Sequence, residues 1–140
     1  MQEKIKTYKL ISLTLVSSNF KREADIDFSN TEIKNSVDID VQHSVNEDVI
    51  IINLEVKLIG KLKQKKLFSF STIYVGQFEK GDETILPIEK FVDANGPAIM
   101  YPFVREHIAG TSLKAGMNPI LLPPVNFVKL NSDRLKKGLK

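Results

Sequence analysis

The 140-residue sequence contains no cysteine, which excludes a disulfide framework, a thiolate metal site and a cysteine nucleophile. No apolar run approaches the roughly 20 residues that cross a bilayer, so we expect no membrane insertion. The N-terminal residues MQEKIKTYKL lack the apolar core and the small-residue cleavage site of a secretory signal. Together these absences predict a cytoplasmic protein.

Motifs for catalysis and for metal binding are also missing. His43 and His107 are isolated, whereas structural zinc usually needs four nitrogen or sulfur ligands. The glycines are too scattered for a phosphate-binding loop, and no serine sits in a nucleophile-elbow motif. Asp38 and Asp40 form a pair of carboxylates, but they lie on the polar side of an alternating segment, which is typical of solvated charges. We therefore expect no enzyme activity, no metal and no cofactor.

The composition, 42% hydrophobic and 26% charged, is that of one globular domain spanning residues 1–140. Lysine and arginine gather in two segments, 57–66 and 129–140. Such clusters attract nucleic acid or acidic protein surfaces, although a solvated face is the simpler interpretation. Because aromatic residues follow the first cluster, one hypothesis is a single-stranded nucleic-acid-binding protein that uses residues 57–66.

The first half of the chain alternates apolar and polar residues, which predicts β-strands. Short polar breaks separate the alternating runs and indicate hairpins. Ser17-Ser18-Asn19 interrupts the first run and suggests a bulge. The expected strands, joined by short turns into an antiparallel sheet, cover residues 4–16, 33–45, 49–59 and 67–78.

The second half predicts helices, so the fold class is α+β. Residues 87–94 favour a short helix that ends before Gly96. Apolar residues at helical spacing predict a long helix from about Pro102 to near Gly116. A proline-stiffened apolar loop follows, and Asn126 is a plausible N-cap for a C-terminal helix over residues 127–137.

Two blocks of this half resemble a known family. Residues 101–106 read YPFVRE and residues 119–127 read PILLPPVNF, and this pairing is similar to the C-terminal half of SecB export chaperones. The resemblance implies a four-stranded antiparallel sheet, a long helix, an apolar crossover loop and a C-terminal helix. It also implies a homotetramer, built as a dimer of dimers, that binds unfolded polypeptides in apolar grooves without ATP. Exposed apolar surface of this kind usually marks a binding site.

The resemblance assigns roles to particular residues. A client groove would be lined by Ile33, Val37, Ile39, Val41, Leu121, Leu122, Pro123, Pro124, Val125, Phe127 and Leu130. An interface between subunits would use Met100, Phe103, Val104 and Ile108 on the long helix. Each groove residue could equally belong to an ordinary core.

Two departures bear on partners. Export-dedicated SecB proteins dock on the ATPase SecA through acidic residues, whereas the corresponding positions here are near Ser17, Lys21 and Ser71. An acidic tail is replaced by a basic one. Because complementary charge governs partner choice, docking on SecA is doubtful. The clients could be preproteins, or an antitoxin, as for SecB-like chaperones of toxin–antitoxin systems.

Overall fold

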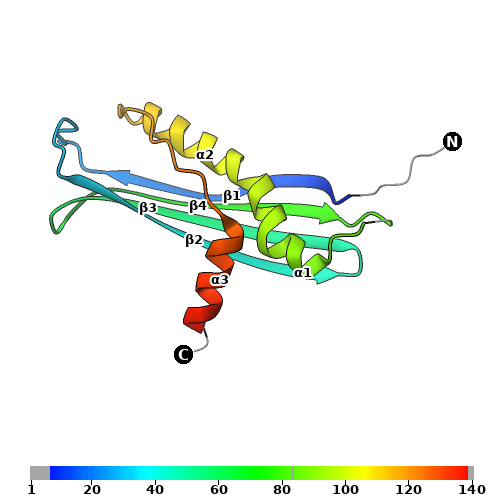
Figure 1. The fold of residues 1–140 in the computed structure, drawn as a ribbon. Helices are drawn as coiled ribbons and strands as arrows, with labels where there is room; N and C mark the ends of the chain where they lie inside the picture. Colours follow the sequence, from blue (N-terminus) through cyan, green and yellow to red (C-terminus); the bar gives the residue numbers. More distant parts are fainter. Residues whose placement is uncertain (1–6, 83, 139–140) are drawn as a thin grey trace.

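Four long antiparallel strands carry a layer of helices on one face (Figure 1). The structure is a computed structural model that describes residues 7–82 and 84–138, with side chains described as far as residue 132. The strands are β1 (Lys9–Arg22), β2 (Ile33–Asn46), β3 (Val49–Leu62) and β4 (Lys65–Glu79). The helical segments are α1 (Ile88–Lys90), the π-helical turn η1 (Phe91–Asn95), α2 (Gly96–Lys114) and α3 (Phe127–Gly138). The α+β class and the order of elements agree with the sequence-based prediction.

The order of strands in the sheet is β1-β4-β3-β2. Of the short turns expected between consecutive strands, the one between β1 and β2 is not found, because these two strands are not neighbours. Only β2–β3 and β3–β4 are tight hairpins, with Glu47 and Lys63 in the left-handed region at φ 57° and 56°. Residues 23–32 instead carry the chain to the far edge of the sheet, so that β1 and β2 form its two edges.

β1 continues through Ser17-Ser18-Asn19, which the sequence pattern predicted as an interruption. The pairing of β1 with β4 shifts between Leu10 and Ser12 and again between Leu15 and Ser17, so bulges lie at Ile11 and Val16. Each extra residue in β1 shifts its pairing with β4 by one position, and the strand continues on both sides. The first residues of the predicted strand, 4–6, lie outside the described part of the chain.

The core lies between the sheet and α2. The face of the sheet towards the helices is called the inner face, and the opposite one the outer face. Alternate residues of β3 on the inner face are at most 1% exposed, as the alternation predicted: Ile50, Ile52, Leu54, Val56 and Leu58. Met100, Val104 and Ile108 of α2 pack on them and are completely buried. Since α2 lies over β3 and β4, β2 remains uncovered by it.

The long helix begins earlier than the sequence predicted. Gly96 is its first residue, not a residue past the end of a separate helix, and the helix continues through Pro102. An interior proline costs a helix about 3 kcal/mol. Pro102 is exposed, while Tyr101 and Val104 beside it are buried against the rest of the protein. Burial on both sides of the proline offsets this cost.

Two glycines bring the helical layer close to the sheet. A Cβ atom on Gly96 would lie 2.3 Å from the Cδ1 atom of Ile52 in β3. A Cβ atom on Gly76 of β4 would lie 2.9 Å from the sulfur of Met100. Larger residues at either position would push α2 away from the strands. The glycine that we expected to end a helix therefore serves packing instead.

Candidate functional site

The segment that joins α2 to α3, residues 115–126, is called the crossover segment. Hydrogen bonds fix it to the helix. The Tyr101 hydroxyl donates to the carbonyl of Pro123 at 2.7 Å, and the Ser112 hydroxyl accepts from the backbone N–H of Ile120 at 3.0 Å. Both bonds satisfy backbone groups that an irregular segment leaves without secondary-structure partners. The apolar run is therefore held in one extended conformation.

Arg22, the last residue of β1, fixes the beginning of the crossover segment. Its guanidinium donates to the carbonyl of Ala115 at 2.6 Å and to the carbonyls of Glu23 and Ala24 at 2.8 and 3.0 Å. The same guanidinium lies 5.2 Å from the centre of the Phe28 ring. This one side chain joins the end of α2 to residues 23–32.

The crossover segment has two buried residues, separated by exposed and half-buried ones. Leu122 and Met117 are 2% and 6% exposed and anchor the segment in the core. Leu121 is 75% exposed, and Pro123 and Pro124 are also exposed. Neighbouring side chains of an extended chain point in opposite directions, so one set anchors the segment and the other faces solvent. The prolines stiffen the exposed set without needing an N–H partner.

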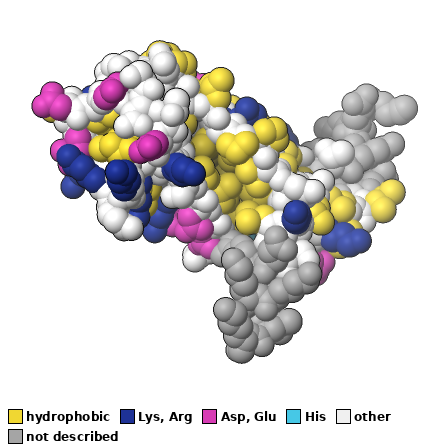
Figure 2. All heavy atoms as spheres, turned by 60° about the vertical axis from the view of Figure 1, so that its left-hand side comes forward, with side chains coloured by type: hydrophobic (Ala, Val, Ile, Leu, Met, Phe, Trp, Pro, Cys, Tyr) yellow, Lys and Arg dark blue, Asp and Glu magenta, His cyan; other side chains and the backbone are white. Residues whose placement is uncertain are grey.

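A hollow of about 220 Å³ lies between the crossover segment and residues 28–35. One wall consists of Phe28, Asn30, Ile33 and Asn35, and the other of Met117, Asn118 and Ile120, with Phe68 also lining it. On the face of the protein shown in Figure 2, hydrophobic side chains form a continuous area beside a group of lysine and arginine side chains. Of the predicted groove residues, Ile33 lines this hollow, and the predicted crossover residues lie outside it.

The remaining β2 residues of the predicted groove lie on the inner face. Val37, Ile39 and Val41 are paired in register with buried residues of β3. Val37 is 39% exposed, whereas Ile39 and Val41 are half-buried. They continue the apolar surface of the sheet beyond α2 towards the β2 edge.

Several predicted residues belong instead to the chain's own core. Leu122 and Phe127 are 2% and 4% exposed, because they anchor the crossover segment and the start of α3. Phe127 packs edge-on against Tyr101, with ring centres 5.6 Å apart. Of the predicted groove residues, the ones with accessible surface are Ile33, Val37, Ile39, Val41, Leu121, Pro123, Pro124, Val125 and Leu130.

The predicted subunit interface needs a similar correction. Met100, Val104 and Ile108 are completely buried against the sheet, so their side chains have no surface left for a partner. Of the four predicted interface residues, only Phe103, at 45% exposure, faces outward from α2. The helical spacing identified an apolar stripe correctly, but a stripe alone does not distinguish intrachain packing from packing between chains.

Of the residues that line the hollow, sequence reasoning assigned only Ile33 to the groove; among the residues it missed are Phe28, Met117 and Ile120. Ile120 lies in the apolar run that the sequence pattern singled out. Phe28 is an apolar residue in a mostly polar segment, which indicates that it anchors this segment to the rest of the protein. Its contribution depends on Arg22, a contact that no local pattern predicts.

The titratable groups near the site have structural roles. Burial raises the pKa of the Tyr101 hydroxyl above its usual 10.0, so it stays protonated and donates to Pro123 at neutral pH. Ser18 and the His107 ring lie within hydrogen-bonding distance, 2.7 Å, and join β1 to α2. Across residues 7–82 and 84–138, no group of three or more histidine, aspartate or glutamate side chains could hold a metal ion.

The model of the SecB family, described as preprotein translocase subunit SecB, matches residues 17–138. This match covers the sheet except for the first part of β1, and it includes α2, the crossover segment and α3. The chain belongs to the SecB family.

Curated relatives agree with this assignment. The protein-export protein SecB of Erythrobacter litoralis is 32% identical over 98 residues, which cover 68% of this chain and 53% of that protein. The uncharacterized protein MJ0357 of Methanocaldococcus jannaschii is 30% identical over 103 residues, covering 70% and 64% of the two chains. The chain thus spans about half to two thirds of the length of these relatives.

A solved structure shares the SecB fold. The SecB-like chaperone Rv1957 of Mycobacterium tuberculosis, in complex with a ChAD peptide from the Rv1956 HigA1 antitoxin, superimposes with a TM-score of 0.73. The alignment covers 86% of this chain and 91% of the other, at 9% sequence identity. At 9% identity, this similarity establishes a shared fold and nothing about function.

Two further observations limit the alternatives. The aromatics expected to stack on nucleic-acid bases are Phe68, Phe70 and Tyr74, and all three lie on the inner face. Phe68 and Phe70 are each 3% exposed, and Tyr74 is half-buried. The stacking part of the nucleic-acid hypothesis is therefore not favoured. Among the described helices, none is both long and apolar enough to span a membrane.

Proposed function

We propose that this SecB-family protein is a molecular chaperone that holds unfolded polypeptides without ATP. The observation that carries the proposal is the hollow between Ile33 and Ile120, which both apolar side chains and asparagines line, together with the exposed Leu121 beside it. An extended client would place apolar side chains in the hollow and along Val37. Because the walls are fixed by hydrogen bonds and prolines, little ordering cost falls on the protein when a client binds.

The proposed clients are polypeptides with exposed apolar stretches, either preproteins or an antitoxin. The Erythrobacter litoralis relative is named a protein-export protein, which supports preproteins as clients. The structural neighbour is a chaperone in complex with an antitoxin peptide, which supports an antitoxin as the client. Docking on SecA is not part of the proposal, because Ser17, Lys21 and Ser71 on the outer face offer no carboxylate. The proposal includes a cytoplasmic location, where newly made polypeptides are still unfolded.

We further propose that the protein assembles as a homotetramer, a dimer of dimers. Two separate surfaces support it. The outward side of α2 exposes Ile99, Phe103 and Leu113 at 42%, 45% and 57%. β1 is an edge strand of 14 residues, and Val16 on it is 54% exposed. Long exposed edge strands favour pairing with another chain. One interface would join two chains, and the other would join two dimers.

Titration with a permanently unfolded polypeptide, such as reduced and carboxymethylated α-lactalbumin, tests the chaperone proposal. We expect saturable binding of this polypeptide without ATP. We also expect the protein to suppress aggregation of a heat-denatured client at about one chaperone assembly per client molecule. Single-stranded DNA provides the matched probe at low and moderate salt. Salt-sensitive binding to the DNA, with no binding to the unfolded polypeptide, would contradict the chaperone function.

Mass measurement in solution tests the assembly. Phe103→Glu introduces a charge on the outward side of α2, and Val16→Lys introduces one on the β1 edge. If the two surfaces form separate interfaces, each variant reduces a tetramer to dimers. A concentration-independent monomer for the unmodified chain would overturn the proposed assembly.

A further inference from the structure

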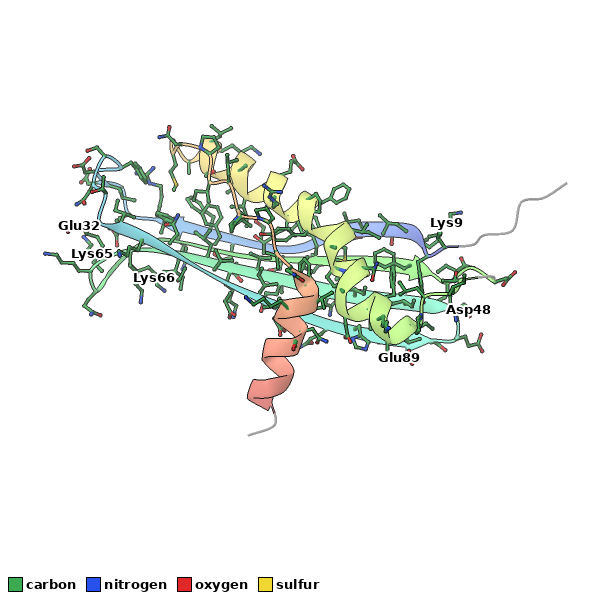
Figure 3. All side chains as sticks on the ribbon, viewed as in Figure 1. Lys9, Glu32, Asp48, Lys65, Lys66 and Glu89 are labelled. Atoms are coloured by element: carbon green, nitrogen blue, oxygen red, sulfur yellow. The ribbon has the colours of Figure 1, made fainter. Side chains whose placement is uncertain are left out.

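The outer face of the sheet carries a row of lysines at the end where the β3–β4 hairpin lies. Lys61 of β3 is paired in register with Lys34 of β2 on one side and with Lys66 of β4 on the other. Partners in register point to the same face and lie about 4.8 Å apart across the strands. All three lysines are exposed. Figure 3 shows Lys65 and Lys66 at this end of the sheet, far from Lys9 and Asp48.

Such a row is unfavourable in the free protein, because like charges directly opposite one another destabilise an antiparallel pair. Among the described residues, no ion pair is found for Lys34, Lys61 or Lys66, whereas Lys57 lies 3.7 Å from Glu55. Opposite charges on neighbouring strands would instead stabilise the pairing. An unneutralised row therefore indicates a surface whose charge is balanced by something that binds to it.

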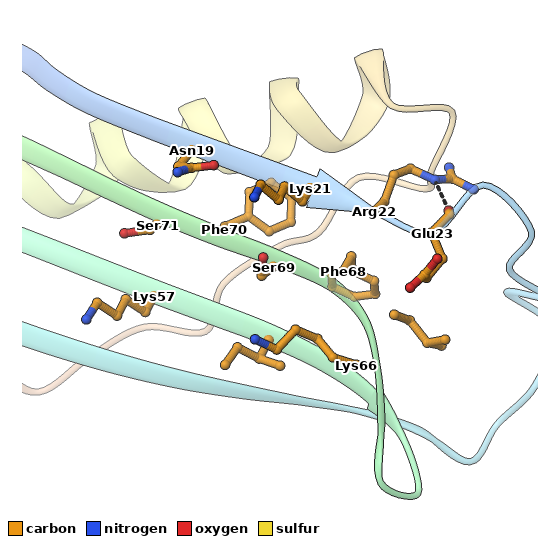
Figure 4. Close-up of a pocket in the computed structure, with 12 residues that line it drawn as sticks. Asn19, Lys21, Arg22, Glu23, Lys57, Lys66, Phe68, Ser69, Phe70 and Ser71 are labelled. Carbon is orange, nitrogen blue, oxygen red and sulfur yellow. Dashed lines mark hydrogen bonds between the residues drawn. The ribbon is translucent and has the colours of Figure 1, made fainter.

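Next to the lysine row, the outer face is hollowed. A depression of about 540 Å³ spans β1, β4 and β3 (Figure 4). In register, Ser69 of β4 lies between Lys21 of β1 and Ile59 of β3, and Ser71 lies between Asn19 and Lys57. The small serines form the floor, since larger side chains stand on the strands at either side. Figure 4 shows Lys21, Lys57 and Lys66 around this floor.

A second depression, of about 530 Å³, extends the surface past the row. It is lined by Lys34, Lys61 and Lys63 together with Glu32, Asn35 and Ser36. The two depressions therefore meet at the lysine row. Their linings offer ammonium groups, the Arg22 guanidinium and hydroxyls, all of which donate hydrogen bonds to carboxylates. Each depression also has one carboxylate, Glu23 in the first and Glu32 in the second, so the positive charges outnumber the negative ones.

We propose that this surface docks an acidic segment of a partner protein. It is separate from the client hollow, which lies on the inner side of the sheet. A polypeptide fits better than single-stranded nucleic acid, because the aromatic rings of this region, Phe68 and Phe70, are buried on the inner face and leave nothing to stack on bases. Carboxylates along an extended acidic segment would lie between the lysines and bond to the serine floor.

The probe is a fluorescein-labelled 12-residue peptide of alternating glutamate and serine, and fluorescence anisotropy at low salt follows its binding to the full chain. A peptide with glutamine in place of glutamate is the matched neutral probe, and a 12-nucleotide oligothymidylate is the nucleic-acid probe. We expect binding of the acidic peptide, weakened by salt, with no binding of the neutral peptide. Tighter binding of the oligonucleotide than of the acidic peptide would overturn the choice of partner.

The triple variant Lys34→Gln, Lys61→Gln, Lys66→Gln removes the row. Its matched control, Lys9→Gln, Lys114→Gln, Lys129→Gln, removes the same charge from exposed lysines elsewhere. We expect binding of the acidic peptide to weaken about tenfold in the first variant and less than twofold in the control. Equal weakening in both would show that only net charge matters and would overturn the site. Binding of an unfolded client should be unchanged in the first variant, so failure here and failure of the chaperone proposal are distinguishable.

Discussion

Substitutions of Leu121 and Leu122 test whether different residues of the crossover segment stabilise the fold and bind clients. The two neighbours have the same side chain, yet Leu121 is 75% exposed and Leu122 is 2% exposed. Leu122 contributes to the core, whereas we propose that Leu121 contacts clients. Substituting each in turn should therefore separate stability from binding.

The magnitudes follow from these exposures. Leu122→Ala should lower the free energy of unfolding by about 2–5 kcal/mol, the usual cost of removing a fully buried leucine side chain. Leu121→Ser should change it by less than about 0.5 kcal/mol, as for most surface substitutions. Complete burial of a leucine side chain is worth about 1.5–3 kcal/mol. Since three quarters of Leu121 is available, a client gains about 1–2 kcal/mol there, so its loss weakens binding about 5- to 30-fold.

Urea unfolding followed by circular dichroism measures the first quantity, and titration with an unfolded polypeptide measures the second. Binding is compared at a temperature where both variants are fully folded. Unchanged binding in Leu121→Ser would remove this residue from the client surface. A similar loss of stability in both variants would contradict the difference in burial between Leu121 and Leu122.

Three further predictions concern stability. Tyr101→Phe removes the hydroxyl that holds the crossover segment and should lower the free energy of unfolding by about 0.5–1.5 kcal/mol at pH 7. Burial raises the pKa of Tyr101 in the folded protein above 10.0, the value taken for the unfolded chain. The stability that the protonated hydroxyl contributes is therefore present below pH 10 and is lost as the pH rises through the folded-state pKa. Stability at alkaline pH should accordingly fall less in Tyr101→Phe than in the unmodified protein. Arg22→Met removes hydrogen bonds to three carbonyls and should cost about 1–3 kcal/mol, with faster amide exchange in the last turn of α2; unchanged exchange there would contradict the anchoring role. Gly60→Ala places a Cβ atom 2.2 Å from the Phe68 ring and should destabilise by about 1–3 kcal/mol. Its matched control, Gly110→Ala on α2, meets nothing within 4 Å and should stabilise by about 0.5–1 kcal/mol; thermal melts that rank the two glycine variants the other way would refute this packing.

Much of the fold was predictable from local pattern. The alternation in residues 33–45 and 49–59 fixed which side chains of β2 and β3 face inward, because side chains alternate with a period of two. Asn126 as an N-cap was also predicted correctly, and its side-chain oxygen accepts from the backbone N–H of Lys129 at 3.1 Å. The start of α2 was not predictable, because Gly96 and Pro102 are unfavourable in an isolated helix and only packing on the sheet retains them.

By itself, the sequence determined the elements, the inner and outer faces of the strands, and the two blocks that point to the SecB family. Each of these depends on residues close together in the chain. Tertiary structure alone decided that β1 lies beside β4, that Met100, Val104 and Ile108 are core rather than interface, and that Ile33 faces Ile120 across a hollow. It also brought Lys34, Lys61 and Lys66 into one row. The physical reason is that burial and charge density depend on distances between residues far apart in sequence, and only the folded chain sets those distances.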